Sequence, residues 1–199
     1  MDNESRDQPD KLAGSSPRLT GRGILLRRAT DDDVLPLWEA AVASKAELIP
    51  WLPWCHEHYS LEETAQWLAL CREGWDSRES FYFVVTDEVS GSIIGACGLH
   101  RVDWPNRRAD LGYWVRSGAQ GSGVATEAAR LLARYGLEEL GLARLEIIVE
   151  CGNAASERVA GKVGAKREGV LRHRLWLREC SHDAVSYSLT VEDLPRLQQ

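Results

Sequence analysis

The chain has 199 residues, of which 44% are hydrophobic and 27% are charged, a balance typical of one soluble globular domain with a real core. Its 24 basic residues are outnumbered by 30 acidic ones, for a net charge of −6, which argues against nucleic-acid binding and against a polybasic membrane patch. No apolar run approaches the roughly 18 residues of a membrane span, and the polar, acidic start predicts no secretory signal. The five cysteines include no CxxC pair, so we expect free thiols and a cytoplasmic, reducing location.

The N-terminal part of the chain predicts a tail followed by alternating structure. Residues 1–17 are too polar to offset the entropy of ordering, so we expect a disordered tail there and one domain over residues 18–199. A first strand is predicted at 23–28, and Thr30 can cap the helix that follows it. Two prolines make residues 48–58 a loop with aromatic anchors, and Ser60 with Glu63 predicts a capping box on the next helix.

Five of the eight tryptophans lie between residues 38 and 75. The simplest interpretation is a layer of helices packed on a sheet, and we assign Trp38 and Trp67 to that core. The alternative is an aromatic wall along a substrate cleft. We expect at least one of Trp51 and Trp54 to line such a cleft.

The rest of the chain predicts a strand-rich α+β domain. Three short strands with tight turns predict an antiparallel meander, and a glycine-rich turn then leads into a long amphipathic helix that ends at Gly141. The predicted elements are, in chain order, strands 81–86, 92–99 and 108–115, helix 124–140, strand 144–150, helix 153–163, and strands 170–177 and 184–190 joined by a polar turn.

Residues 115–125, with the sequence VRSGAQGSGVA, carry the most chemical information. Glycines let backbone N–H groups approach a ligand closely, and the helix that follows adds free N–H donors and a positive dipole end. This combination predicts an anion cradle that needs no lysine, although a connection that binds nothing is the alternative. A P-loop is excluded because no lysine follows, and Thr126 replaces the third glycine of a dinucleotide fingerprint.

Within this segment, Gln120-x-x-Gly123-x-Ala125 resembles the acetyl-coenzyme A signature of the GNAT acetyltransferases. The order of the surrounding motifs is similar to the RimJ/RimL branch, the ribosomal-protein N-terminal acetyltransferases. The resemblance covers about residues 18–193 and is more specific for the cofactor than for the acceptor. It implies an α+β (α/β) GNAT fold, with a mixed, mostly antiparallel central sheet whose strands splay and which helices flank. The supporting motifs are Asp110-Leu-Gly112-Tyr113-Trp114-Val115, Asn153-x-x-Ser156 and Lys162-Val163-Gly164-Ala165.

The resemblance also implies roles for individual residues. Backbone groups of Val115 and Arg116 are expected to pair with the pantetheine arm of acetyl-CoA, in a slot beside the splayed strand 144–150. Asn153 is expected to contact the same arm, and Ser156 to give a proton to the departing thiolate, unless both serve only to cap their helix. Arg158 and Lys162 are expected to contact the adenosine phosphate, unless they only face solvent. The pyrophosphate is expected to lie against Gln120, Gly121, Ser122, Gly123, Val124 and Ala125.

Acetyl transfer requires a neutral amine, which bears on the need for a general base. A free α-amine has a pKa of about 7.7–8.0 and a lysine about 10.4, so an N-terminal acceptor needs little help and positioning supplies most of the rate. The candidate bases are Asp110, Glu150 and His173. Asp110 is shorter than the glutamate that the family usually has there, and His173 is better explained as a surface residue. Leu175 occupies the place where some RimL-type enzymes have a glutamate.

The sequence therefore predicts an acetyl-CoA-dependent N-acetyltransferase acting on a primary amine, preferably a protein N-terminal α-amine of the ribosomal-protein type. The alternatives are a small-amine acetyltransferase, with a polyamine, amino sugar or antibiotic as acceptor, and a non-catalytic acyl-CoA sensor. Residues 55–58 read Cys-His-Glu-His but lack a matching second pair, so we expect a polar acceptor loop and no metal. We expect no nucleic-acid or membrane partner; a homodimer is compatible with the family, although no residue pattern encodes one.

Overall fold

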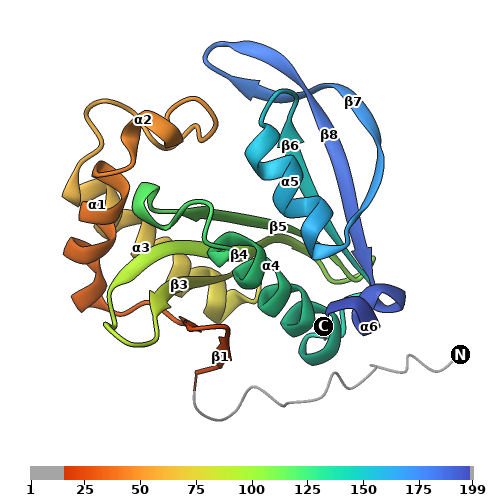
Figure 1. Ribbon diagram of the computed structural model, residues 1–199, viewed down its shortest axis with the longest axis horizontal. Coiled ribbons are helices and arrows are strands. Elements are labelled where there is room, and N and C mark those ends of the chain that lie inside the picture. The colour runs from red at the N-terminus through yellow and green to blue at the C-terminus, as the bar shows by residue number, and fades with distance from the viewer. Residues whose placement is uncertain (1–15, 198–199) are drawn as a thin grey trace, which may run out of the picture.

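The computed structural model describes residues 16–197, and Figure 1 shows their arrangement. The predicted tail lies almost wholly outside the described residues and stays a prediction. The helices are α1 (Val34–Val42), α2 (Lys45–Leu48), α3 (Leu61–Ser77), α4 (Val124–Arg134), α5 (Ala154–Val163) and α6 (Leu194–Leu197). The strands are β1 (Arg18–Gly21), β2 (Ile24–Arg27), β3 (Phe81–Asp87), β4 (Ile93–Asp103), β5 (Arg108–Val115), β6 (Arg144–Glu150), β7 (Lys166–Leu177) and β8 (Cys180–Thr190).

The eight strands form one sheet in the order β1-β2-β3-β4-β5-β6-β8-β7. Every neighbouring pair is antiparallel except β5 and β6, which are parallel. The predicted meander is confirmed as β3, β4 and β5, and the predicted strand at 144–150 coincides with β6. The mixed, mostly antiparallel sheet expected from the sequence is therefore present.

Helix starts follow the capping chemistry that the sequence indicates. The Ser60 hydroxyl accepts from the Glu63 backbone N–H at 3.2 Å, and the Glu63 carboxylate accepts from the Ser60 N–H at 2.8 Å. This reciprocal pair satisfies two N–H groups that would otherwise lack partners at the start of α3. Asn153 likewise caps α5, because its Oδ1 accepts from the Ser156 N–H at 3.0 Å.

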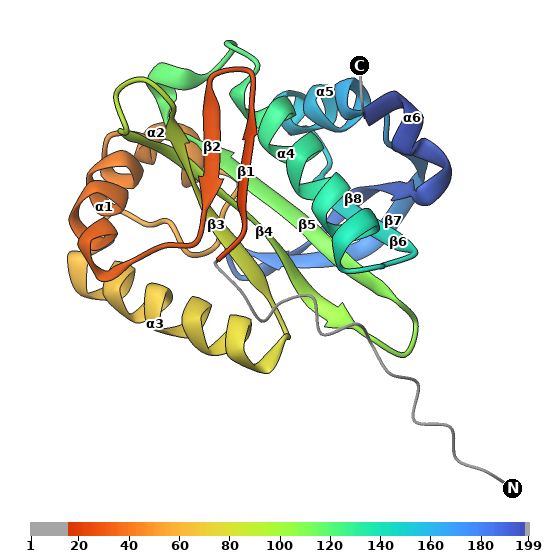
Figure 2. The same ribbon diagram turned by 90° about the horizontal axis from the view of Figure 1, so that it is seen from below.

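The two faces of the sheet are covered by different helices (Figure 2). On one face Ala109 and Leu111 of β5 belong to the main core with Leu132 of α4. On the other face a second cluster joins Leu37 of α1 and Leu68 of α3 to β3 and β4, with Trp67 and Trp114 packed against it. The strand alternation of side chains thus places Asp110, Gly112 and Trp114 on the face opposite to α4.

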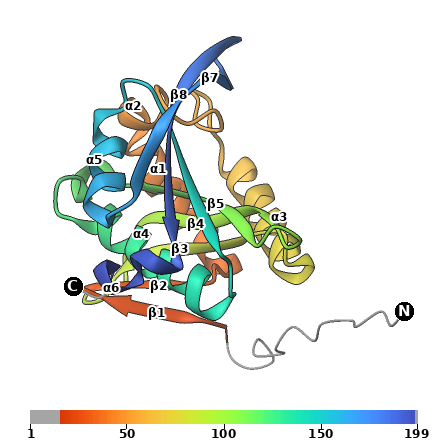
Figure 3. The ribbon, with the colours of Figure 1, turned by 90° about the vertical axis from the view of Figure 1, so that its right-hand side faces the viewer.

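The pairing of β5 with β6 is short. Only Arg108↔Arg144, Ala109↔Leu145 and Asp110↔Glu146 are in register, and the two strands then separate. Figure 3 shows β6 and β8 running at a steep angle to β3–β5. The backbone of β5 beyond Asp110 therefore has no strand on its β6 side, which confirms the predicted slot.

Several predicted boundaries were wrong, among them the start of β7, which is Lys166 and not residue 170, and the end of β4, which is Asp103 and not residue 99. The first strand is preceded by β1, which forms a hairpin with β2 through Arg22 and Gly23, both with positive φ. The long helix leaves α-helical geometry after Arg134 and continues as a π-helical turn over Tyr135–Glu139. The predicted polar turn after residue 177 is only Arg178 and Glu179, because β8 already begins at Cys180.

Candidate active site

The loop between β5 and α4 presents backbone donors to solvent. Gly121 has φ +76° and Gly123 φ +93°, left-handed values that strain any residue with a Cβ. The first backbone bond into α4 joins the Glu127 N–H to the Gly123 carbonyl at 3.0 Å. The N–H groups of the preceding first turn of α4 consequently have no helical partner and can receive an anion.

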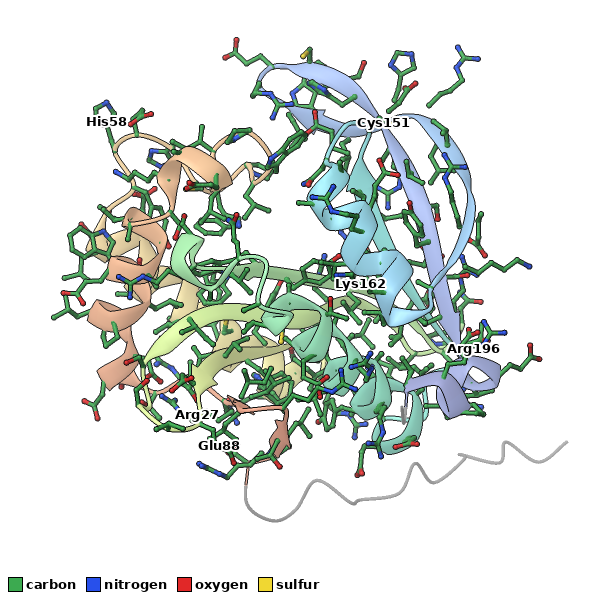
Figure 4. The ribbon with its side chains drawn as sticks, in the orientation of Figure 1. Arg27, His58, Glu88, Cys151, Lys162 and Arg196 are labelled. Carbon is green, nitrogen blue, oxygen red and sulfur yellow. The ribbon has the colours of Figure 1, made fainter. Side chains whose placement is uncertain are left out.

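A cavity of about 330 Å³ lies at this helix start. Three basic side chains border it: Arg22, Arg130 and Lys162. Figure 4 labels Lys162 near the C-terminal end of α5. Arg130 donates to the Glu127 carboxylate at 2.6 Å, so part of the positive charge is already neutralised. Ser122, Gly123, Val124, Thr126 and Glu127 complete the lining.

The lining differs from the residues expected from the sequence. Lys162 borders the cavity, whereas Arg158 is exposed one turn earlier on α5 and is not among the lining residues; their predicted contact with the adenosine phosphate stays a prediction. Arg130 was missed, because a single arginine in an amphipathic helix carries no motif. The cavity combines basic side chains with unpartnered N–H groups, so it suits a ligand with several phosphate groups.

The edge of β5 that faces the slot can hold an extended ligand. Val115 pairs with Gly95 of β4, and the Arg116 N–H donates to the Ile94 carbonyl at 2.8 Å. These bonds use the β4 side of the strand and leave the β6 side unpaired beyond Asp110. A ligand arm with two amides fits such an edge in the manner of an added strand.

A hydroxyl pair joins β5 to α5 at the slot. The Tyr113 hydroxyl lies 3.1 Å from Ser156 Oγ and donates to the Ser156 carbonyl at 3.1 Å. Burial raises the pKa of Tyr113 to about 12, so the hydroxyl keeps its proton. Ser156 is thus not merely part of a cap, since its side chain takes part in this pair. Tyr113 was missed as a site residue, although it stands in the Gly-Tyr-Trp motif.

Asp110 is buried at the point where β5 and β6 separate. Its Oδ2 accepts from Arg101 Nη1 at 3.1 Å and lies 4.0 Å from His100 Nε2. Burial lowers the pKa of His100 and outweighs the opposing effect of Asp110. The Asp110 carboxylate therefore already has a cationic partner and a neutral imidazole beside it. No motif in the sequence marks His100 as a site residue.

Glu150 ends β6 and is 8% exposed. Its Oε1 accepts from Arg178 and lies 2.9 Å from Nδ1 of His182. Its Oε2 is buried without a hydrogen-bond partner among residues 16–197. His173, the third candidate base, is exposed on β7 and contacts Ser181 Oγ at 2.6 Å.

The loop over residues 49–59 lies beside the tip of the β7–β8 hairpin. Arg178 donates to the Pro50 carbonyl, which ties the two segments together. Trp54 is 37% exposed and packs on Tyr59 and Trp114, with ring centroids 5.3 and 5.7 Å apart. This aromatic group fits the expected cleft wall.

The Cys-His-Glu-His run over residues 55–58 does not converge. Cys55 is buried, His56 Nε2 lies 2.8 Å from Glu63, and His58 is exposed (Figure 4). Within the described part of the chain, no group of three His, Cys, Asp or Glu side chains is arranged to hold a metal ion. No helix between residues 16 and 197 has the length and apolar character for crossing a bilayer.

Residues 24–166 match the family described as "Acetyltransferase (GNAT) domain". The ribosomal-protein-serine acetyltransferase of Escherichia coli (strain K12) is 25% identical over 171 residues, covering 84% of this chain and 92% of that protein. YdaF of Bacillus subtilis (strain 168) is 40% identical over 99 residues, and spermidine N(1)-acetyltransferase of Escherichia coli (strain K12) is 32% identical over 103 residues. These two matches cover 50% and 52% of this chain and 54% of each relative, so the chain spans about half the length of both.

Solved structures show the same architecture. RimL, a ribosomal-protein alpha-N-acetyltransferase in complex with coenzyme A, superposes with a TM-score of 0.82 at 21% identity. The superposition covers 88% of this chain and 99% of that one. It shows that the fold is shared.

Proposed function

Since the chain belongs to the GNAT acetyltransferase family, we propose that it transfers an acetyl group from acetyl-CoA to a primary amine, preferably the α-amine at a protein N-terminus. One observation carries the proposal. The unpaired edge of β5 leads directly to a cavity where basic side chains and free N–H groups converge. A long ligand with amides at one end and phosphates at the other matches this strand edge followed by this cavity.

Different residues of this chain bind different parts of the coenzyme. The N–H groups from Gly121 to Ala125, with Gln120 and Ser122 beside them, hold the pyrophosphate. Lys162 and Arg130 add charge, and Arg158 serves the outer phosphate from its exposed position. The β6-facing edge of β5 at Val115 binds the pantetheine amides, whereas the backbone N–H and carbonyl of Arg116 are already bonded to Ile94 and Ala119. The side chain of Asn153 stays with its helix as a cap.

Acetyl-CoA supplies an acetyl group activated as a thioester. When the amine attacks the carbonyl carbon, the carbon–sulfur bond breaks and the sulfur takes a proton. Ser156 Oγ–H, held in place by its 3.1 Å contact with the Tyr113 hydroxyl, gives that proton, and the proton that the attacking amine loses returns through solvent to Ser156. The face of the sheet that carries Asp110 and Glu150 receives the amine.

The two carboxylates favour an acceptor that is already partly neutral. Asp110 accepts from Arg101, and Glu150 accepts from Arg178. Both carboxylates therefore already have arginine partners and are not free to pair with an incoming amine. An α-amine with a pKa of about 7.7–8.0 needs less help than a lysine at about 10.4, which supports an N-terminal acceptor.

A small amine is the second candidate acceptor, because a spermidine N(1)-acetyltransferase is 32% identical over about half of the chain. A sensor that binds acyl-CoA without turnover is the remaining alternative.

Release of coenzyme A thiol, measured with a panel of acceptors, tests the proposal. We expect turnover with peptides that have free N-termini, none with the same peptides N-terminally blocked, and weak turnover with spermidine and amino sugars. Turnover with small amines alone would replace the acceptor assignment. Tight coenzyme binding with no thiol release from any acceptor would instead favour the sensor. A cytoplasmic location and a homodimer stay predictions.

A further inference from the structure

Three side chains form a line at the tip of the β7–β8 hairpin. Cys180 Sγ lies 3.0 Å from His182 Nε2, and His182 Nδ1 lies 2.9 Å from Glu150 Oε1. A thiol, an imidazole and a carboxylate in this order are the arrangement by which proteins activate a sulfur nucleophile. The cysteine is exposed, whereas the carboxylate is buried.

Glu150 is the buried end of the Cys180–His182–Glu150 arrangement. Only 8% of its surface is exposed, and Oε2 lacks a hydrogen-bond partner among the described residues. Oε1 also accepts from Arg178, whose Nη2 lies 3.5 Å from His182 Nδ1. His182 Nδ1 faces the same oxygen, Oε1, so the buried carboxylate holds the imidazole on one side and the guanidinium on the other.

The His182 ring connects the Glu150 carboxylate to the Cys180 sulfur. Its Nε2 contacts both Cys180 Sγ and the Leu177 carbonyl, which lies 3.1 Å away. Nδ1 faces the Glu150 carboxylate while Nε2 faces the sulfur, so the ring is placed to receive the thiol proton of Cys180.

The backbone holds the sulfur in place. Arg178 and Glu179 form the two-residue turn between the paired residues Leu177 and Cys180, with φ of +49° and +61°. Non-glycine residues occupy such values only when the surrounding contacts maintain them. The contacts of Arg178 with Glu150 and Pro50 are such constraints.

The other cysteines lack this environment. Burial raises the pKa of Cys55, Cys71 and Cys97, to about 12 for Cys71. Cys151 is free and exposed like Cys180, and it lies just before α5 (Figure 4). Cys151 has no histidine contact among the described residues, so the chain contains its own control.

We propose that Cys180 is an activated thiol that exchanges with small disulfides, forming a mixed disulfide at the entrance to the acceptor site. The Cys180 thiolate attacks one sulfur of the small disulfide, a new S–S bond forms and the old one breaks. The released thiolate takes the proton held by His182. No other oxidant is needed, because the small disulfide is the oxidised reactant.

The position of the sulfur links this exchange to acceptor use. Glu150 holds both His182 and Arg178, and Arg178 reaches Pro50 in the 49–59 loop. An adduct on Cys180 alters this connection, so we expect reversible loss of acceptor turnover. That last expectation rests on the proposed function, whereas the exchange itself does not.

The test follows disulfide labelling of the reduced full-length protein by mass spectrometry, without acetyl-CoA or acceptor. Oxidised glutathione and coenzyme A disulfide are the two probes. We expect Cys180 to be labelled about tenfold faster than Cys151, because the rate follows the thiolate fraction. Equal rates with the two probes indicate access from solution, and a faster reaction with the coenzyme disulfide indicates delivery through the coenzyme site.

Matched variants identify the cause. His182→Asn and Glu150→Gln are expected to slow the labelling of Cys180 towards the rate of Cys151. His173→Asn, which changes another histidine of the same hairpin, is expected to leave it unchanged, as is Cys151→Ser. Labelling of Cys180 no faster than that of Cys151 in the unaltered protein would overturn the proposal without any variant. Full labelling speed in a folded His182→Asn protein would do the same.

Discussion

The two ends of the slot are built in different ways. At the proposed coenzyme end, one continuous stretch of backbone, residues 115–125, supplies the edge of β5 and the start of α4. At the proposed acceptor end, side chains from three distant segments meet, namely Glu150, Arg178 and the loop that carries Pro50. Backbone donors do not depend on side-chain identity, whereas contacts between side chains change with each substitution.

The largest expected effect lies at the coenzyme end. Gly123→Leu forces a branched side chain into φ +93° and into the lined cavity. We expect coenzyme A affinity, measured by calorimetry, to fall about 100-fold, equivalent to about 2.7 kcal/mol. Gly91→Leu, at φ +70° in the β3–β4 turn, is the matched control for backbone strain. Unchanged affinity in a folded Gly123→Leu protein would contradict the cradle.

The next effect concerns the hydroxyl pair between the two ends. Ser156→Ala should lower kcat by about 10- to 100-fold and leave the KM for acetyl-CoA nearly unchanged, because proton donation acts on the leaving sulfur. Tyr113→Phe should lower kcat by less. Tyr187→Phe removes another tyrosine hydroxyl that contacts α5, the one that donates to Glu157 at 2.9 Å, and should not affect kcat. A normal kcat in Ser156→Ala would leave only a structural role for the pair.

A smaller effect is expected at the acceptor end. Arg178→Ala removes the link between the hairpin and the 49–59 loop. We expect the KM for the acceptor to rise about tenfold, or about 1.4 kcal/mol, with the KM for acetyl-CoA unchanged. Arg172→Ala, exposed on β7, is the control. Equal changes in both KM values would show that the two ends are not independent.

The smallest expected effect concerns the ion pair between Arg144 and Glu168, which lies outside both ends of the slot. Hydrogen bonds from Arg144, together with one from Ser188, lower the pKa of Glu168 to about 2. The ionised form therefore adds stability that is complete above the ordinary pKa of about 4.3 and is lost as the pH falls towards 2. The side chain is one-third exposed, so we expect Glu168→Gln to cost only about 0.5–1 kcal/mol near neutral pH.

Urea unfolding of Glu168→Gln and the unaltered protein over the acid range measures this difference. It should shrink as the pH falls. The exposed Glu88, labelled in Figure 4, provides Glu88→Gln as a control without such an effect. A difference that persists at the lowest pH would mean that the side chain acts through packing.

Features set by neighbouring residues were predictable from the sequence. The Ser60–Glu63 capping box and the strand at 144–150 each depend on a few adjacent residues. The same holds for the cap by Asn153. The coenzyme site was predicted from chain order and one short motif, because its proposed residues are adjacent in the sequence, and it stays a prediction.

Features set by distant contacts were not predictable. The turn at Arg178 and Glu179 lacks the glycine or asparagine that usually marks a two-residue hairpin, so β8 was predicted to begin four residues late, at 184 in place of Cys180. The proximity of His100 to Asp110, and of His182 to Glu150, depends on strand register. Register follows from the whole sheet, which a single sequence does not reveal.

The short pairing of β5 with β6 has a consequence for the whole molecule. Three residue pairs form the only strand pairing between the β1–β5 part of the sheet and the β6–β8 part in the described residues. In the proposed function, a coenzyme bound along β5 and against α5 would span that junction and add contacts that the protein's own backbone lacks. Ligand at 100 times its Kd adds about 2.7 kcal/mol of stability, so bound coenzyme would then hold the two parts of the sheet together more firmly.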